Sequence, residues 1–242
     1  MFDKNLRLGL VLTPRLGGDR QRPIRGVQSN TCTPCIALWR LVALLPLFPL
    51  EVVLFPGNPL PLHIFEPRYK EMIGECLANQ SQFGVVRAVE QGIAEVGCAA
   101  EIVTVTKKYE DGRLDLVAEG RGRFEVLELN QERSFLRGEV LFVPDESGEP
   151  PEAEKARATQ LHREILTLAG AVQDLSGAAP GALSFYLAGS LPLDLDFKQT
   201  LLGTRSETER MQILAEYFEK ILPGLRRAAN ARKKAGGNGH AV

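Results

Sequence analysis

The sequence predicts an α+β fold, in which a β-barrel or half-barrel of about six or seven strands with one helix is followed by a small C-terminal helical bundle. Two observations support this prediction. Short segments of β-branched or alternating apolar residues follow one another up to about residue 143, at a spacing typical of barrels. Beyond residue 155, apolar residues recur every three or four positions, which is the period of helices.

The first of these segments is rich in proline. Residues 45–69 hold six prolines, and most residues between them are large and apolar. Proline lacks the backbone donor that central strands and helix interiors need. We therefore expect short extended pieces, joined by rigid turns and buried against a scaffold.

The remaining strands are expected from period-two patterns and from one turn signal. Asp111-Gly112 is a strong hairpin signal between two of them. Gly120 and Gly122 are not interpreted as a dinucleotide-binding motif, because no third glycine follows at the required spacing and a strand, not a helix, is expected next. Residues 120–123 are therefore expected to form a turn before a strand. The expected strands are residues 83–89, 102–106, 114–118, 124–129 and 136–143.

One helix is expected to interrupt the strands, beginning at Pro67, a residue type that suits a first helical turn. Its apolar face would hold Tyr69, Met72, Ile73, Cys76 and Leu77. In the second half, the first helix would present Leu161, Ile165, Leu168 and Val172. Two short helices are expected near residues 183–190 and 195–202. The last would start at Ser206, with Glu209 completing a capping box, and would present Met211, Leu214, Phe218, Ile221, Leu222 and Leu225.

These patterns divide the chain into five parts, and charge separates them further. Residues 1–43 are expected to be a disordered or non-native extension, 44–144 the β-rich subdomain, 145–154 a linker, 155–225 the helical subdomain and 226–242 a basic disordered tail. Residues 44–219 hold 16 basic and 28 acidic side chains, whereas residues 220–242 hold six basic side chains and no acid. An acidic body repels phosphate backbones, so we do not expect it to bind nucleic acid.

Several spaced motifs resemble one family. The segment 46–69, followed by Phe83-Gly84-Val85, residues 97–102 and Gly120-x-x-Arg123-Phe124, is similar to the substrate-binding, amino-terminal domain of Lon-type ATP-dependent proteases. The resemblance covers residues 44 to 225 in the right order. It implies a PUA-like fold and a stand-alone protein-binding module, which would recognise unfolded or exposed apolar segments and could deliver them to a separate protease or chaperone.

The catalytic parts of such proteases are not found in the sequence. A phosphate-binding Walker loop requires Gly-Lys, a dipeptide that the chain lacks, and the Ser-Lys peptidase portion has no room. We therefore expect no enzyme activity and no cofactor. No metal site is expected either, because Cys32-x-x-Cys35 lacks a second pair of ligands at metal-binding spacing and the histidines His63, His162 and His240 are scattered.

The candidate binding surface is the proline-rich segment itself. A proline-stiffened turn costs little entropy to present to a ligand, and an open strand edge could capture an extended peptide. The candidate contact residues are Phe55, Pro56, Gly57, His63 and Tyr69. The alternative is that Phe48, Phe55, Phe65 and Tyr69 fill the barrel core. Acid–base chemistry by His63, Glu66 and Arg68 is not expected, because Arg68 would pair with a carboxylate or bind backbone carbonyls.

The expected partners are therefore protein or peptide clients. The alternative function is RNA binding by a PUA-like module through the basic C-terminal tail. The most apolar uncharged run, residues 41–50, contains two prolines and is too short to cross a membrane. We expect a cytoplasmic protein whose Cys76 and Cys98 are buried, reduced and apolar in character. The sequence does not predict the oligomeric state.

Overall fold

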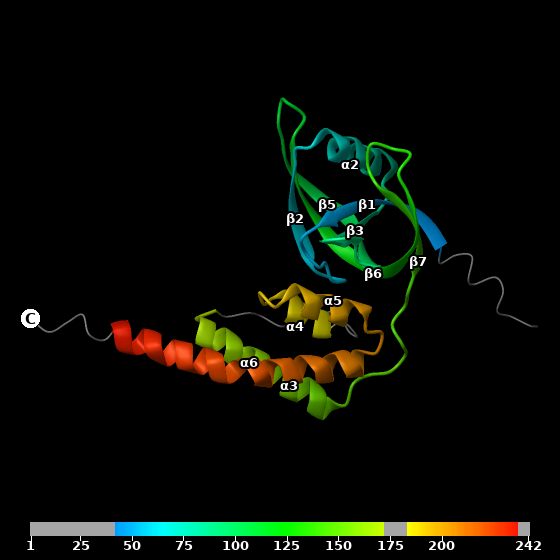
Figure 1. Cartoon of the computed structure of the whole chain (residues 1–242). Coiled ribbons are helices and arrows are strands. Elements are labelled where there is room, and N and C mark those ends of the chain that lie inside the picture. Colours follow the sequence, from blue (N-terminus) through cyan, green and yellow to red (C-terminus); the bar gives the residue numbers. More distant parts are fainter. Residues whose placement is uncertain (1–41, 172–182, 237–242) are drawn as a thin grey trace, which may run out of the picture. The chain divides into compact units, whose positions relative to one another are not determined.

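The computed structural model describes residues 42–171 and 183–236. In this part of the chain, seven strands come first, interrupted by one helix, and four further helices follow (Figure 1). The strands are β1 (Val42–Leu50), β2 (Pro59–Ile64), β3 (Phe83–Val89), β4 (Gly92–Ile93), β5 (Val96–Lys108), β6 (Leu114–Asn130) and β7 (Arg137–Phe142). The helices are α2 (Pro67–Asn79), α3 (Glu152–Ala169), α4 (Leu183–Gly189), α5 (Leu195–Gly203) and α6 (Glu207–Gly236). The predicted α+β class is confirmed.

Five of the strands close into a ring in the order β1-β7-β6-β5-β3. Strand β1 closes it by pairing with two partners. Its first half, residues 42–46, runs antiparallel to β7, and its second half, residues 47–50, runs parallel to β3. Strand β2 pairs with β6, and β4 pairs with β3. The prediction of a barrel is thus confirmed.

Strand β1 corrects the expectation of short pieces joined by turns. It is one nine-residue strand despite Pro46 and Pro49. Pro46 is the last residue paired with β7, and Leu47 is the first paired with β3. The backbone N–H that Pro46 lacks therefore falls at the point where pairing with β7 ends and pairing with β3 begins. Its absence interrupts the hydrogen bonds of neither pairing.

A second correction concerns β6. The predicted strands 114–118 and 124–129 are halves of one 17-residue strand, and residues 120–123 lie inside it rather than in a turn. The physical reason for Gly120 is close approach: an added Cβ would lie 2.2 Å from the carbonyl oxygen of Phe55. The predicted hairpin is present, since β5 and β6 flank the turn at Gly112, which has φ of +81°.

Helix α2 lies across one end of the strand ring (Figure 1). It begins at Pro67 as predicted, and four residues of the predicted face are buried: Tyr69, Met72, Ile73 and Cys76. They pack with strand residues in one apolar cluster, which includes Phe48, Ile64, Phe83, Val85 and Leu116. The helix therefore closes the barrel core at that end.

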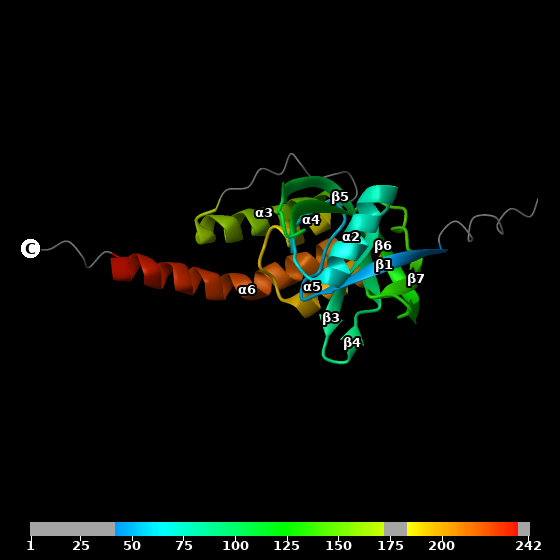
Figure 2. The ribbon, with the colours of Figure 1, turned by 90° about the horizontal axis from the view of Figure 1, so that it is seen from above.

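Helices α3 and α6 lie side by side (Figures 1 and 2). The Ser206 hydroxyl caps α6 by accepting a hydrogen bond from the Glu209 backbone amide at 3.4 Å. Two predicted boundaries are wrong: α3 already begins at Glu152, and α6 continues to Gly236 rather than giving way to a tail at residue 226. Arg226, the first residue of the expected tail, lies on α6 and pairs with Glu164 on α3 at 2.7 Å. Val172 and residues 1–41 and 237–242 lie outside the described residues.

A buried ionic network joins the strands to the helices. Arg123 on β6 donates hydrogen bonds to the carbonyl oxygens of Leu202 and Thr204, at 2.8 and 2.7 Å, and to Asp145. Arg210 on α6 also binds Asp145, with Nη2 to Oδ2 at 2.6 Å. Asp145, expected to lie in a linker, therefore anchors both subdomains. None of the helices described is long and apolar enough to span a membrane.

Candidate functional site

Two of the five predicted contact residues lie in the interior. Phe55 is 1% exposed and belongs to the apolar cluster of the helical subdomain, where its ring stacks on Phe185 with centroids 5.1 Å apart. Tyr69 is 8% exposed and packs against Phe48 at 4.2 Å between centroids. The alternative interpretation, that these aromatic residues fill the barrel core, matches Phe48 and Tyr69. It does not match Phe55, which is buried in the helical cluster instead, or Phe65, which is 58% exposed.

The turn at Phe55-Pro56-Gly57-Asn58 is fixed at both ends. The Asn58 amide donates to the Phe55 carbonyl at 3.1 Å, and Gly57 has φ of +77°, as position three of a type II turn requires. The Gly57 amide donates to the Gly120 carbonyl at 2.8 Å, and the Gly120 amide donates to the Asn58 carbonyl at 3.0 Å. The turn is thus hydrogen-bonded to β6 through Gly120 and contacts α4 through the Phe55 ring. Of its four residues, only Gly57 is exposed to solvent.

A small apolar hollow lies elsewhere in the same segment, between β1 and β2. We name it the β1–β2 groove. It has a volume of about 220 Å³ and is lined by Phe48, Pro49, Leu50, Leu62, His63, Ile64, Phe65, Glu66, Arg68 and Tyr69. The two strands leave this space because β2 pairs with β6 and β1 pairs with β3 and β7, in the part of the chain described. His63 and Tyr69, two of the five predicted contact residues, both line this groove.

Aromatic and charged side chains form the rim of the groove. The rings of Phe65 and His63 stack with centroids 5.9 Å apart. His63 Nδ1 lies 2.5 Å from Asp115 Oδ1, and the Tyr109 hydroxyl donates to Asp115 Oδ2 at 2.8 Å. These two bonds, first that of His63, lower the pKa of Asp115. The network holds the His63 ring, and through it the neighbouring Phe65 ring, at the mouth of the groove.

The same network gives no indication of catalysis. Glu66 and Arg68, considered with His63 for acid–base work, pair with each other at 2.8 Å. Among the described residues, no hydroxyl or thiol is hydrogen-bonded to His63 that could act as a nucleophile. Arg68 also lies over the Tyr69 ring, 4.5 Å from its centroid, which fixes the entrance to the groove.

Strand addition at the outer edge of β2 is hindered by proline. Because Asn58 accepts a hydrogen bond from Gly120 on β6, residues 58, 60, 62 and 64 point their backbone groups at β6 and the alternate residues point outward. Two of those outward positions are Pro59 and Pro61, which have no N–H to offer. The groove is therefore better suited to holding side chains than to pairing with a backbone.

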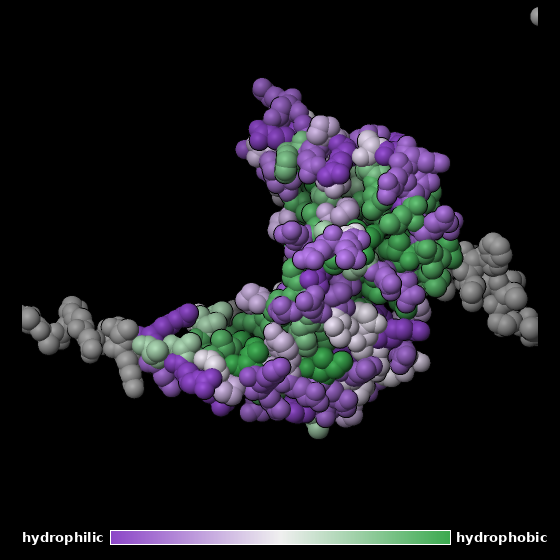
Figure 3. Space-filling model, in the orientation of Figure 1, coloured by the Kyte–Doolittle hydropathy of each residue, from purple (hydrophilic) through white to green (hydrophobic). Residues whose placement is uncertain are grey.

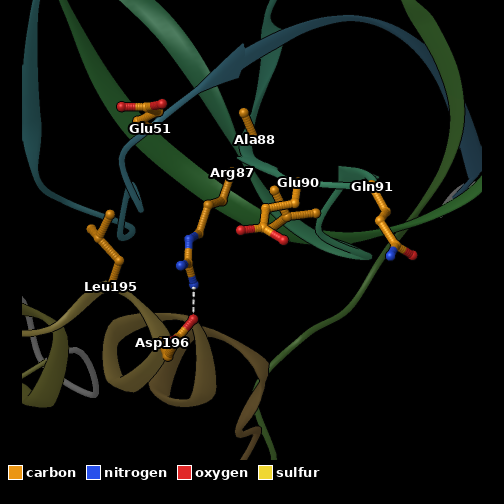
Figure 4. A pocket seen from close by; sticks show the side chains of 8 residues that line it. Glu51, Arg87, Ala88, Glu90, Gln91, Leu195 and Asp196 are labelled. Atoms are coloured by element: carbon orange, nitrogen blue, oxygen red, sulfur yellow. Dashed lines mark hydrogen bonds and ion pairs between the residues drawn. The ribbon is translucent and has the colours of Figure 1, made fainter.

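A second hollow, a cleft beside β3 and α5, has a different character. It measures about 760 Å³ and is lined by Glu51, Arg87, Ala88, Val89, Glu90, Gln91, Leu195 and Asp196. Arg87 reaches from β3 to Asp196 on α5, with Nη1 to Oδ1 at 2.6 Å (Figure 4). The remaining charged groups, Glu51 and Glu90, form no ion pair with any described residue. We name this hollow the acidic cleft.

Apolar side chains are also exposed on the outer face of the ring, near β1 and β7 (Figure 3). Separately, four exposed large apolar residues lie on β1 and β6 at 42 to 53% exposure: Val42, Leu44, Leu127 and Leu129. They line none of the hollows described here.

The described residues hold no cluster of three or more His, Cys, Asp or Glu side chains that could bind a metal ion. Cys76 and Cys98 are free and buried, as predicted, and burial raises the pKa of Cys98 to about 12. Cys32, Cys35 and His240 lie outside the described residues. The sequence pattern did not identify Phe65 as a surface residue. The one signal for its exposure was its position directly after Ile64, where β2 ends.

Sequence similarity to known proteins extends over most of this chain. A family model described as the ATP-dependent protease La (LON) substrate-binding domain matches residues 44–220. Lon protease of Anaeromyxobacter dehalogenans is 32% identical over 74% of this chain, and Lon protease 2 of Myxococcus xanthus is 32% identical over 73%. In each case the match spans only 23% of the relative's length.

Solved structures agree with this similarity. The Lon N-terminal domain protein from Xanthomonas campestris superimposes with a TM-score of 0.60, is 29% identical, and matches 72% of this chain and 98% of its own. The N-terminal domain of the Mycobacterium avium complex Lon protease, 21% identical with a TM-score of 0.54, shares the fold. The similarity lies in the substrate-binding domain and includes neither the ATPase nor the peptidase part. The chain belongs to the Lon substrate-binding domain family.

Proposed function

We propose that this chain is a non-catalytic protein-binding module that recognises unfolded polypeptides by holding their apolar side chains in the β1–β2 groove. The observation that carries the proposal is the 58% exposure of Phe65 beside an apolar hollow. An aromatic side chain held at such a mouth exposes apolar area to water, and a ligand's apolar side chain would remove that area from water.

The groove supports a broad preference rather than recognition of one sequence. Its volume of about 220 Å³ accommodates one or two apolar side chains. Its lining is mostly aliphatic, aromatic and proline carbon, with His63, Glu66 and Arg68 at the rim and already paired. Such a surface selects side chains by size and hydrophobicity, which suits a module that meets many clients.

Binding of unfolded clients can be tested with one protein in two states. The full chain is immobilised and incubated with a reduced, carboxymethylated model protein, and in parallel with the same protein in its native form. The proposal expects strong retention of the unfolded form and little of the native form. Equal retention would contradict it, and so would cleavage of casein or hydrolysis of ATP by the purified chain.

Delivery of clients to a separate protease or chaperone extends the proposal. In that case the client and the protease would bind this module at the same time. A cytoplasmic setting fits the free, buried thiols of Cys76 and Cys98, which a reducing compartment would preserve.

RNA binding through the C-terminal basic residues is the other candidate. Arg226 is engaged by Glu164, whereas Arg227 and Arg232 are exposed on α6 without an ion pair to a described residue. A gel shift at several salt concentrations tests it, because phosphate contacts weaken steeply with salt. We expect no shift with single- or double-stranded RNA at physiological salt, and a shift that Arg227→Gln/Arg232→Gln abolishes would favour this alternative.

A further inference from the structure

The β1–β2 groove and the acidic cleft are consecutive along the chain. Leu50 lines the groove, and Glu51, the next residue, lines the cleft. Leu50 is also paired with Arg87, which reaches across the cleft to Asp196. The end of β1 therefore borders both hollows.

The charges of the cleft are unbalanced. Arg87 is neutralised by Asp196, so the described structure leaves Glu51 and Glu90 without a counter-charge (Figure 4). Both side chains are exposed, and Val89 and Leu195 supply apolar area beside them. Lysine and arginine suit this lining, because their ammonium or guanidinium groups complement the carboxylates while their methylene stems cover apolar surface.

We propose that the groove and the cleft together select apolar segments that are flanked by lysine or arginine. This inference rests on the proposed function and specifies its substrate class. The groove supplies the apolar contact area, and the cleft supplies charge complementarity, which sets preference among clients. Segments flanked by glutamate or aspartate would meet Glu51 and Glu90 and be disfavoured.

Three fluorescein-labelled peptides test the inference with the full chain. They share one extended apolar core and are flanked by lysine, serine or glutamate. Binding is followed by fluorescence anisotropy at low salt and at high salt. We expect the lysine peptide to bind about tenfold more tightly than the glutamate peptide at low salt, and about twofold at high salt, because both carboxylates are exposed to screening.

Two charge-matched variants separate the cleft from the overall charge. Glu51→Gln/Glu90→Gln should reduce the tenfold ratio to about twofold while leaving the affinity of the serine peptide unchanged. Glu125→Gln/Glu139→Gln removes the same charge from exposed residues on β6 and β7, which form no ion pair with a described residue. This control should keep the ratio near tenfold.

Each result decides the question. A lysine-to-glutamate ratio near one in the unmodified chain overturns the inference while leaving groove binding intact. An equal fall in both double variants overturns it too, because the effect would then come from net charge. If none of the three peptides binds, the proposed function fails, and the inference fails with it.

Discussion

The guanidinium of Arg210 lies over the ring of Phe185, with its central carbon 4.2 Å from the ring centroid, and both side chains are fully buried. Its nitrogens donate to Ser184, Asp145, Glu207 and the Thr204 carbonyl, at 2.6 to 3.2 Å. Because Asp145 also binds Arg123 on β6, this arrangement holds the helices against the barrel. The cleft depends on that junction, since Leu195 and Asp196 of its lining belong to the helical part.

Replacing Arg210 should destabilise the fold strongly. Arg210→Met keeps much of the apolar stem but leaves the buried Glu207 without its counter-charge, whereas Asp145 keeps Arg123. Breaking a buried ion pair in this way costs about 3 to 5 kcal/mol. The control is Arg226→Met on the same helix, whose exposed pair with Glu164 is screened by solvent. Urea unfolding followed by circular dichroism measures both. Similar midpoints for the two variants would contradict this account of the junction.

Gly120 should tolerate no side chain. An added Cβ would lie 2.2 Å from the Phe55 carbonyl oxygen, and a backbone atom cannot move aside cheaply. Gly120→Ala should cost about 2 to 4 kcal/mol of unfolding free energy, at or above the usual cost of overpacking. Gly74→Ala on α2 is the matched control, because nothing lies within 4 Å of its added Cβ. In a helix it should be neutral or stabilising by up to ~1 kcal/mol, so a loss there equal to that of Gly120→Ala would argue against close approach as the cause.

His162 should make stability fall in mildly acid solution. The side chain is fully buried, and its Nε2 lies 2.7 Å from Ser190 Oγ. Burial, with a smaller contribution from Arg163, lowers the pKa of His162 from 6.5 to about 4. The unfolded chain therefore takes up a proton on His162 near pH 6.5, whereas the folded chain resists protonation until about pH 4. As the pH is lowered through this window, the free energy of unfolding decreases by up to ~1.4 kcal/mol per pH unit.

The measurement compares unfolding free energies at several pH values from 7 to 4. His162→Leu should show a shallower fall than the unmodified chain across this window, because the leucine has no proton to gain. Parallel curves for His162→Leu and the unmodified chain would show that His162 is not the group responsible.

Much of the fold could be predicted because local patterns and tertiary structure agree. Pro67 begins α2, Gly112 turns the β5–β6 hairpin, and Ser206 caps α6. Gly120 misled the prediction because its reason is tertiary: it makes room for a carbonyl 65 residues earlier in the chain. The apolar pattern of α6 likewise does not indicate that Arg210 is buried, since that depends on partners from three other segments.

The candidate site was only partly predictable. The proline-rich segment lines the groove that we propose as the binding site, but composition alone could not separate Phe55, which is buried against α4, from Phe65, which is exposed. Both are phenylalanines close to a proline, Phe55 directly before Pro56 and Phe65 two residues before Pro67. Their difference comes from the helical subdomain, which covers the Phe55 turn and leaves the end of β2 open. Burial by a distant part of the chain is not encoded in local periodicity.

The most direct test of groove binding is the dissociation constant of the full chain for an unfolded, carboxymethylated model protein, measured for three forms. The forms are the unmodified chain, Phe65→Ser, and Leu127→Ser/Leu129→Ser, which removes two apolar residues of comparable exposure from β6, outside the groove. Losing a central aromatic contact typically costs more than ~1 kcal/mol, so we predict about tenfold weaker binding for Phe65→Ser and unchanged binding for the double leucine variant. Equal affinity of all three forms, or a loss confined to the leucine variant, would contradict the claim that the β1–β2 groove is the binding site.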